Sequence, residues 1–104
     1  MIGVFVTFHL GDRFNEAAVH KIAESVRGRF EGMPGLCSKA FTLNPAKREA
    51  INFYVWNSEA AAQAFFTDEL LERVTGLYGV RPTVDFVQIA ALVANSQLAS
   101  PASG

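Results

Sequence analysis

Residues 49–66 read EAINFYVWNSEAAAQAFF, and this stretch decides the fold because a strand pattern changes there directly into a helix pattern. Aromatic and β-branched residues alternate between two faces in its first half, as they do in strands. The dipeptide Asn57-Ser58 can cap a helix, which the alanines that follow favour. A helix that folded back over one strand face would enclose three side chains, and we expect the site in that gap: Asn52, Tyr54 and Trp56.

The rest of the chain supplies three more strands and one more helix. We expect strands at residues 2–10, 36–43, 49–56 and 83–93, and helices at 16–30 and 58–77, the second with a break near residue 66. Right-handed crossovers place both helices of a βαββαβ chain on one face of the sheet. The predicted fold class is therefore α+β, a ferredoxin-like antiparallel sheet of order 4-1-3-2. Residues 1–94 are expected to form one domain, and residues 95–104 a flexible tail.

The predicted sheet carries apolar side chains on both faces. Ile51, Phe53 and Val55 lie opposite the face of Trp56, and the first and last strands are also apolar on both sides. Two helices can cover only one face, and a large exposed apolar surface normally marks an interface. This pattern predicts a homodimer that packs sheet on sheet. Lys39 falls on an edge strand, where lysine commonly protects the exposed edge.

Composition excludes several classes of function. The net charge is −1 and the chain has no basic run, so neither nucleic acid nor an anionic membrane is expected as a partner. No apolar run reaches the ~20 residues of a membrane helix, and we expect a cytoplasmic protein. Cys37 is the one cysteine, which excludes an intrachain disulfide, and no Cys and His spacing typical of a metal site occurs. We expect Cys37 to be an inert thiol.

The order of elements, the turn MPGL at residues 33–36 and the run YVWNSEA at residues 54–60 resemble dimeric α+β-barrel proteins of the antibiotic-biosynthesis-monooxygenase type. The spacing along residues 6–94 is most similar to the YdhR-like monooxygenase branch of that group. The resemblance implies a cofactor-independent monooxygenase that acts with O2 on a small phenol- or quinol-like aromatic substrate. It implies that the enzyme uses neither a cofactor nor a metal ion. It also implies an apolar pocket with a few hydrogen bonds and a proton route.

The resemblance also suggests site residues. In aromatic-polyketide oxygenases of this group, an Asn four residues before a Trp lines the cleft, and Asn52 and Trp56 match that spacing. We expect Asn52 to orient a substrate oxygen and Trp56 to stack on a ring. His9, at the end of the first strand, is placed to act as a base near neutral pH. Three further residues are expected to contact the substrate: Thr7, Tyr54 and Phe65. Arg73 and Tyr78 could reach the mouth of the cleft.

Other interpretations remain open on the residues alone. Asn52 could instead bond the backbone, Trp56 could be a packing residue, and His9 could be a surface residue at a strand end. The helix after Trp56 offers apolar side chains where the resembling oxygenases offer polar aromatic groups. A non-catalytic module that binds a small ligand or a partner is the main alternative to an oxygenase. Another enzyme class on the same fold, such as a lactone isomerase or a dehalogenating lyase, is a further one.

Overall fold

The computed structural model describes residues 1–95, which form a four-stranded antiparallel sheet with helices on one side. The strands are β1 (Ile2–His9), β2 (Leu36–Asn44), β3 (Glu49–Trp56) and β4 (Thr83–Gln88). The helices are α1 (Glu16–Val26), α2 (Glu59–Phe65) and α3 (Asp68–Tyr78), with short 3-10 turns η1 (Gly11–Arg13) and η2 (Arg27–Phe30). The strand order β2-β3-β1-β4 is the predicted order read from the other edge, so the predicted fold class is confirmed.

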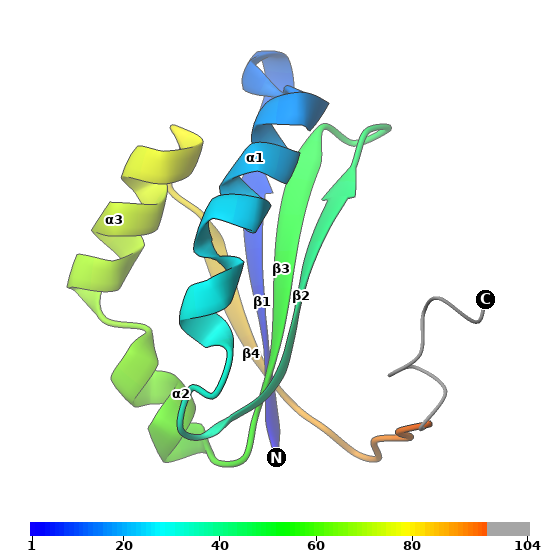
Figure 1. The fold of residues 1–104 in the computed structure, drawn as a ribbon, viewed down its shortest axis with the longest axis vertical. Coiled ribbons are helices and arrows are strands. Elements are labelled where there is room, and N and C mark those ends of the chain that lie inside the picture. The colour runs from blue at the N-terminus through cyan, green and yellow to red at the C-terminus, as the bar shows by residue number, and fades with distance from the viewer. Residues whose placement is uncertain (96–104) are drawn as a thin grey trace.

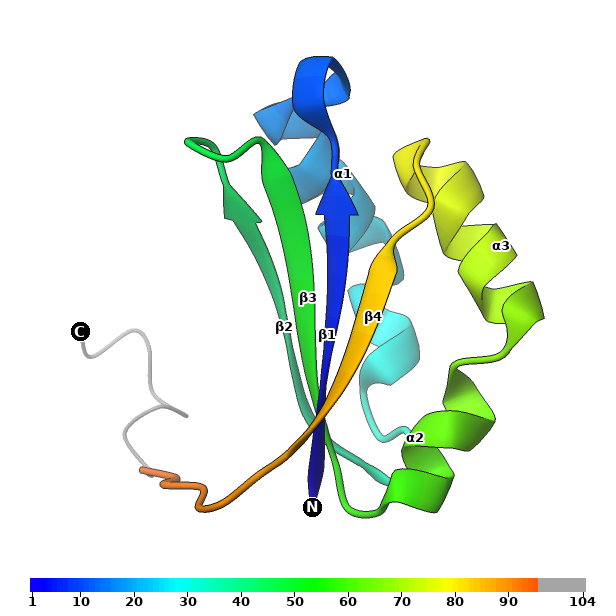
Figure 2. The ribbon, with the colours of Figure 1, turned by 180° about the vertical axis from the view of Figure 1, so that it is seen from behind.

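The three helices cover a single face of the sheet. Figure 1 shows α1, α2 and α3 on the same side, and Figure 2, seen from behind, shows the opposite face with none of the described helices over it. None of the helices in residues 1–95 is both long and apolar enough to cross a membrane. The sheet therefore has one face enclosed by helices and one that the described residues leave open.

Each helix begins at a polar cap, because the first N–H groups of a helix have no partner within it. The side chains of Asn15, Ser58 and Thr67 accept the backbone N–H groups of Ala18, Ala61 and Leu70, at 2.9, 3.1 and 3.2 Å. Thr67, the third of these caps, lies two residues after the end of α2 and begins α3. The predicted break near residue 66 is therefore confirmed.

Two predicted elements are shorter than expected. The helix expected at 16–30 ends at Val26 and continues as η2, where Gly28 has little tendency to stay helical and the last turn tightens. The strand expected to reach residue 93 ends at Gln88, because Gln88 pairs with Ile2, the first residue of β1, and no further strand residue is available beyond it. The predicted tail lies, apart from Asn95, outside the described residues.

The register between β1 and β3 builds the core. Ile2, Val4 and Val6 pair with Trp56, Tyr54 and Asn52, and the alternation of strand side chains sends all six toward the helices. All six are buried there, together with Phe8 and Ala50. The candidate face identified from residues 49–66 is thus the helix-covered face of the sheet.

The turn before β2 packs directly against the start of α2. Gly35 has a φ of 82°, a conformation that favours glycine, and a Cβ at this position would lie 2.9 Å from the Cβ of Ala61. The Gly35 carbonyl accepts the Asn57 N–H at 2.9 Å. This close contact holds the turn before β2 against the start of α2.

The open face of the sheet carries a group of apolar side chains, as its alternation predicts. The rings of Phe5 and Phe53 lie 4.6 Å apart there, and Val87 packs beside them, next to the position of Gly3. Phe5 and Val87 are 38% and 37% exposed. Large apolar side chains on one flat face are a feature that protein interfaces share.

Candidate functional site

A cavity of about 120 Å³ lies between the sheet and the helices. Strands β2 and β3 form its floor, and α1, η2 and α3 form its walls, with Phe65 as the contribution of α2. Most of its lining is apolar or aromatic. The polar and charged side chains that reach it are Arg29, Lys39, Asn52, Tyr54, Arg73 and Tyr78. An apolar pocket with a few converging polar groups is the usual form of a small-molecule site.

Asn52 and Tyr78 form a polar pair on the cavity wall. Asn52 is 4% exposed, and its Nδ2 donates to the Tyr78 hydroxyl oxygen at 3.4 Å. The Tyr78 ring stacks on Phe8 with ring centres 3.7 Å apart, which fixes the position of the hydroxyl. The Tyr78 O–H keeps its own proton to donate, so the pair can bind an oxygen atom of a ligand.

Burial keeps both tyrosines of the cavity protonated. It raises the pKa of Tyr78, and the hydrogen bond from Asn52 offsets only part of that rise. It also raises the pKa of Tyr54, and a negative charge on Tyr78 would raise it further. Both hydroxyl groups are therefore hydrogen-bond donors at neutral pH, and neither is a base.

Trp56 lies behind the cavity and does not line it. The side chain is 1% exposed, and its ring centre lies 5.1 Å from that of Phe65 and 6.0 Å from that of Tyr54. Its Nε1 has no hydrogen-bond partner among the described residues. The structure thus places Trp56 where it supports two side chains of the lining, Tyr54 and Phe65, which do reach the cavity as expected.

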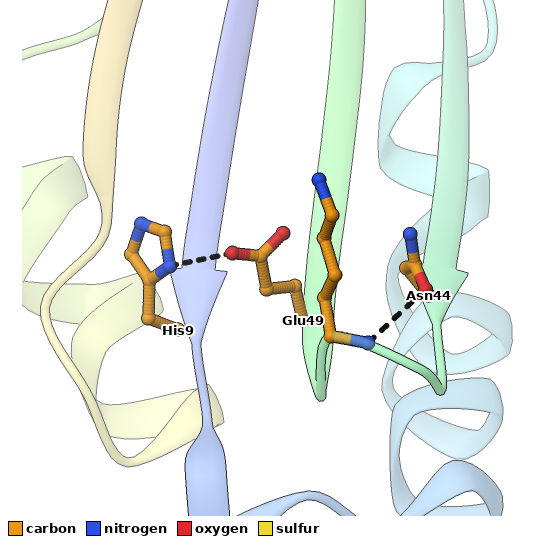
Figure 3. A network of polar contacts seen from close by, with 4 residues as sticks. His9, Asn44 and Glu49 are labelled. Atoms are coloured by element: carbon orange, nitrogen blue, oxygen red, sulfur yellow. Dashed lines mark hydrogen bonds and ion pairs between the residues drawn. The ribbon is translucent and has the colours of Figure 1, made fainter.

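Thr7 and His9 lie on the other face of the sheet. They pair with Ile51 and Glu49, so strand alternation points them away from the helices. Figure 3 shows His9 beside Glu49, whose Oε2 lies 2.7 Å from the His9 Nδ1. The expectation that both residues lie near the cleft is therefore wrong. The antiparallel register groups the even-numbered residues of β1 with Asn52, and leaves Thr7 and His9 with the open face.

Lys39 also lies in an environment different from the one that the sequence predicts. Instead of protecting a solvent-exposed edge, its side chain turns toward the helices, with Nζ 3.3 Å from the ring centre of Phe30. Burial lowers the pKa of Lys39 to about 7. A signal was available in Phe41, two residues further on the same face, which is too apolar for a solvated edge. An irregularity at Cys37, where the pairing of β2 with β3 shifts between Leu36 and Ser38, complicates the alternation.

Arg73 and Tyr78 are placed as expected. Both come from α3 and line the cavity, although nothing near them in sequence marks the site. Arg29 from η2 was not identified from the sequence, because a charged residue near a helix end is usually solvated. The cavity therefore draws its polar groups from four separate elements.

Comparisons with known proteins identify the fold. No protein-family model matches this chain, and no curated protein is detectably similar to it. Among solved structures, it is similar to a monooxygenase from the gene ActVA-Orf6 of Streptomyces coelicolor in complex with Nanaomycin D. The TM-score is 0.68 and the identity 23%, over 91% of this chain and 92% of that one.

Two other solved structures are also similar. A variant of SnoaB, a cofactor-independent oxygenase from Streptomyces nogalater, has a TM-score of 0.65 and 13% identity, over 90% of this chain and 97% of that one. NE2512 from Nitrosomonas europaea, of unknown function, has a TM-score of 0.69 and 18% identity, over 91% of this chain and 94% of that one. The chain thus has the ferredoxin-like α+β fold of antibiotic-biosynthesis monooxygenase structures. At these identities the likeness is one of fold.

Proposed function

We propose that this protein is a monooxygenase that oxidises a small phenol- or quinol-like substrate with O2 and without a bound cofactor. The observation that carries the proposal is the Asn52–Tyr78 pair in the wall of a cavity of about 120 Å³. Cavities on the order of 150 Å³ hold benzene in other proteins. The cavity therefore suits one aromatic ring, with its hydroxyl group toward the polar pair. A fused-ring substrate would require the helices to move.

The solved structures support this choice of reaction. One similar protein is a monooxygenase in complex with Nanaomycin D, and another is a cofactor-independent oxygenase. Because one fold hosts many functions, the site must carry the argument for this chain. The aromatic lining suits a flat ring, and the polar pair suits its oxygen atom.

The proposed reaction draws its electrons from the substrate. Once the phenol has lost its hydroxyl proton, the electron-rich ring can react with O2. One oxygen atom enters the ring, the other leaves as water with two hydrogens from the substrate, and the ring becomes a quinone. Asn52 and the Tyr78 hydroxyl would hold the substrate oxygen while negative charge develops on it. Trp56 would keep the aromatic wall in place from behind.

We also propose that the protein is a cytoplasmic homodimer that assembles through the open face of its sheet. The support is the group of apolar side chains on that face, with Phe5 and Val87 more than a third exposed. The closer relation to the YdhR-like branch belongs to the same proposal, and its support is the spacing along residues 6–94.

Oxygen uptake tests the proposed reaction. Purified protein is supplied with single-ring phenols and quinols, and the consumption of O2 is measured together with the absorbance of the quinone. We expect one O2 consumed per quinone formed. Spontaneous oxidation of a quinol forms hydrogen peroxide instead of water, so added catalase would return oxygen in that case and none in the enzymatic one. Quinone formation at the protein-free rate for every compound would rule the proposal out.

A non-catalytic ligand-binding module is the second candidate. The observation that favours it is the contribution of α2, which within the described residues lines the cavity with Phe65 alone and no polar group. Such a module would bind the same phenols and consume no oxygen. Calorimetric binding without oxygen uptake would therefore establish this alternative.

A further inference from the structure

Lys39 occupies an aromatic cage at the boundary between two spaces. Its Nζ lies 3.3, 4.1 and 4.3 Å from the ring centres of Phe30, Phe41 and Tyr54. The side chain lines the small cavity and also a second, more open groove of about 510 Å³ between α1, η2 and β2. An amine at this position can contact a ligand on one side and exchange protons with water on the other.

The charges around the cavity favour an anion inside it. Arg29 and Arg73 line the cavity together with Lys39, and no aspartate or glutamate of the described chain does so. Within residues 1–95, no carboxylate forms an ion pair with Lys39 at 4.0 Å or less. A nearby positive charge favours the ionised form of an acid, so these side chains oppose the effect of burial, which favours the neutral form of a phenol.

Two opposing effects keep Lys39 able to gain and lose a proton near neutral pH. Burial favours the neutral amine and lowers the pKa of Lys39 to about 7. The three rings favour the ammonium form, because the negative face of an aromatic ring attracts a nearby cation. A neutral amine is therefore available as a base, and the ammonium that it becomes is stabilised where it forms.

The other titratable groups that line the cavity with Lys39 do not share this property. On the cavity side, the two arginines stay protonated, and burial raises the pKa of Tyr54 and Tyr78. On the groove side, five titratable residues line the same space: His20, Glu24, Arg27, Glu31 and Cys37.

We propose that Lys39 is the proton acceptor of the site, and that its amine takes the hydroxyl proton of a phenol bound in the cavity. The O–H bond of the phenol breaks, an N–H bond forms on Nζ, and the electron pair stays on the phenolate oxygen. The ammonium then faces the phenolate and returns its proton through the groove to water. This inference rests on the proposed function for its ligand, and it supplies the base that His9, on the other face, cannot be.

A binding experiment tests the proton transfer without any turnover. The probe is 4-nitrophenol, whose phenolate is coloured and whose phenol is not, added at a pH below its own pKa. Wild-type protein should increase the coloured fraction. Lys39→Met keeps an apolar stem of similar length without the amine, and should leave the bound probe uncoloured. Lys47→Met, at an exposed position in the β2–β3 hairpin, is the matched control and should behave as the wild type does.

A third variant separates a base from a positive charge. Lys39→Arg keeps the charge but cannot accept a proton near neutral pH. It should still bind the coloured phenolate, yet lose the rise of oxygen uptake with pH that the wild type should show around pH 7. Loss of a general base typically lowers turnover ~10²–10⁴-fold. Thermal melts of each variant establish that it is folded.

The outcomes separate this inference from the proposed function. Colour that depends on Lys39, without oxygen uptake for any phenol, would support Lys39 as the proton acceptor and contradict the proposed oxygenase activity. Oxygen uptake that is unchanged in folded Lys39→Met or Lys39→Arg would contradict the role of Lys39 as proton acceptor and leave the proposed oxygenase activity standing. Failure of wild-type protein to colour the probe, or equal colour with Lys39→Met, would also overturn the inference.

Discussion

The backbone of Val6 pairs with that of Asn52 in the antiparallel ladder between β1 and β3. This pairing places both side chains on the helix-covered face, where Asn52 meets Tyr78 from α3. It also places Phe5 and Thr7, which precede and follow Val6 in β1, on the open face with Phe53. One register thus separates the residues proposed to bind a ligand from those proposed to form a dimer, so the two can be tested independently.

The open face provides the first prediction. We expect the wild type to be a dimer by size-exclusion chromatography with light scattering, and Phe53→Asp to shift it to a monomer. An unpaired charge buried in an apolar layer is costly, whereas in a monomer it would be hydrated. Ala17→Asp, on the exposed first turn of α1, is the control and should remain dimeric. A wild type that is monomeric at all concentrations would remove the dimer from the proposal.

Asn52→Ala is the sharpest test of the cavity. If the amide stabilises an oxyanion in the reaction, turnover should fall ~10²–10³-fold while the melting temperature changes little. Asn44→Ala is the matched control, because Asn44 Oδ1 accepts the Lys47 N–H at 3.2 Å in a hairpin far from the cavity. Asn44→Ala should lower the free energy of unfolding without lowering turnover. A loss of ~1–3 kcal/mol in Asn52→Ala with turnover unchanged would instead assign Asn52 a structural role.

Lys39 should make stability depend on pH. Because burial lowers the pKa of Lys39 from 10.5 to about 7, the folded state binds fewer protons than the unfolded state between these values. This destabilising contribution is fully present below pH 7 and disappears as the pH rises toward 10.5. Lys39→Met should therefore have a higher free energy of unfolding in urea than the wild type, and this difference should shrink as the pH rises across that window. A constant difference between the two proteins would contradict the lowered pKa.

Gly35 should tolerate no side chain, because of its packing against α2. Gly35→Ala introduces a Cβ at a φ of 82° and only 2.9 Å from the Ala61 Cβ. Gly32 also has a positive φ, of 71°, but no atom lies within 4 Å of the corresponding Cβ position, so Gly32→Ala measures the backbone strain alone. We expect Gly35→Ala to cost ~1–3 kcal/mol more than Gly32→Ala in chemical unfolding. Equal losses would show that α2 moves aside freely.

Cys37 should be dispensable for any activity. It is exposed at the irregular start of β2, and it lines the outer groove but not the cavity. We expect Cys37→Ser to leave oxygen uptake within a few-fold of the wild type. A folded variant without turnover would assign the thiol a role that its surroundings do not suggest.

The residues of 49–66 determined much of this structure by themselves. The alternation of Asn52, Tyr54 and Trp56 placed them on one face, and the capping residue that follows began a helix there. These features depend on side-chain direction and on hydrogen bonds between near neighbours, which a short stretch of sequence contains. The sequence also predicts, for the same reason, the apolar side chains on the opposite face of this strand.

Tertiary structure decided what those residues meet. The ladder of β1 with β3 sent Thr7 and His9 to the open face, since a change of one residue in register exchanges the two faces of a strand. Packing of η2 over β2 brought Lys39 under the ring of Phe30. The Asn52–Tyr78 pair joins residues that are 26 positions apart, on a strand and a helix. Local pattern carries no information about such a meeting, because it arises only when the helices close over the sheet.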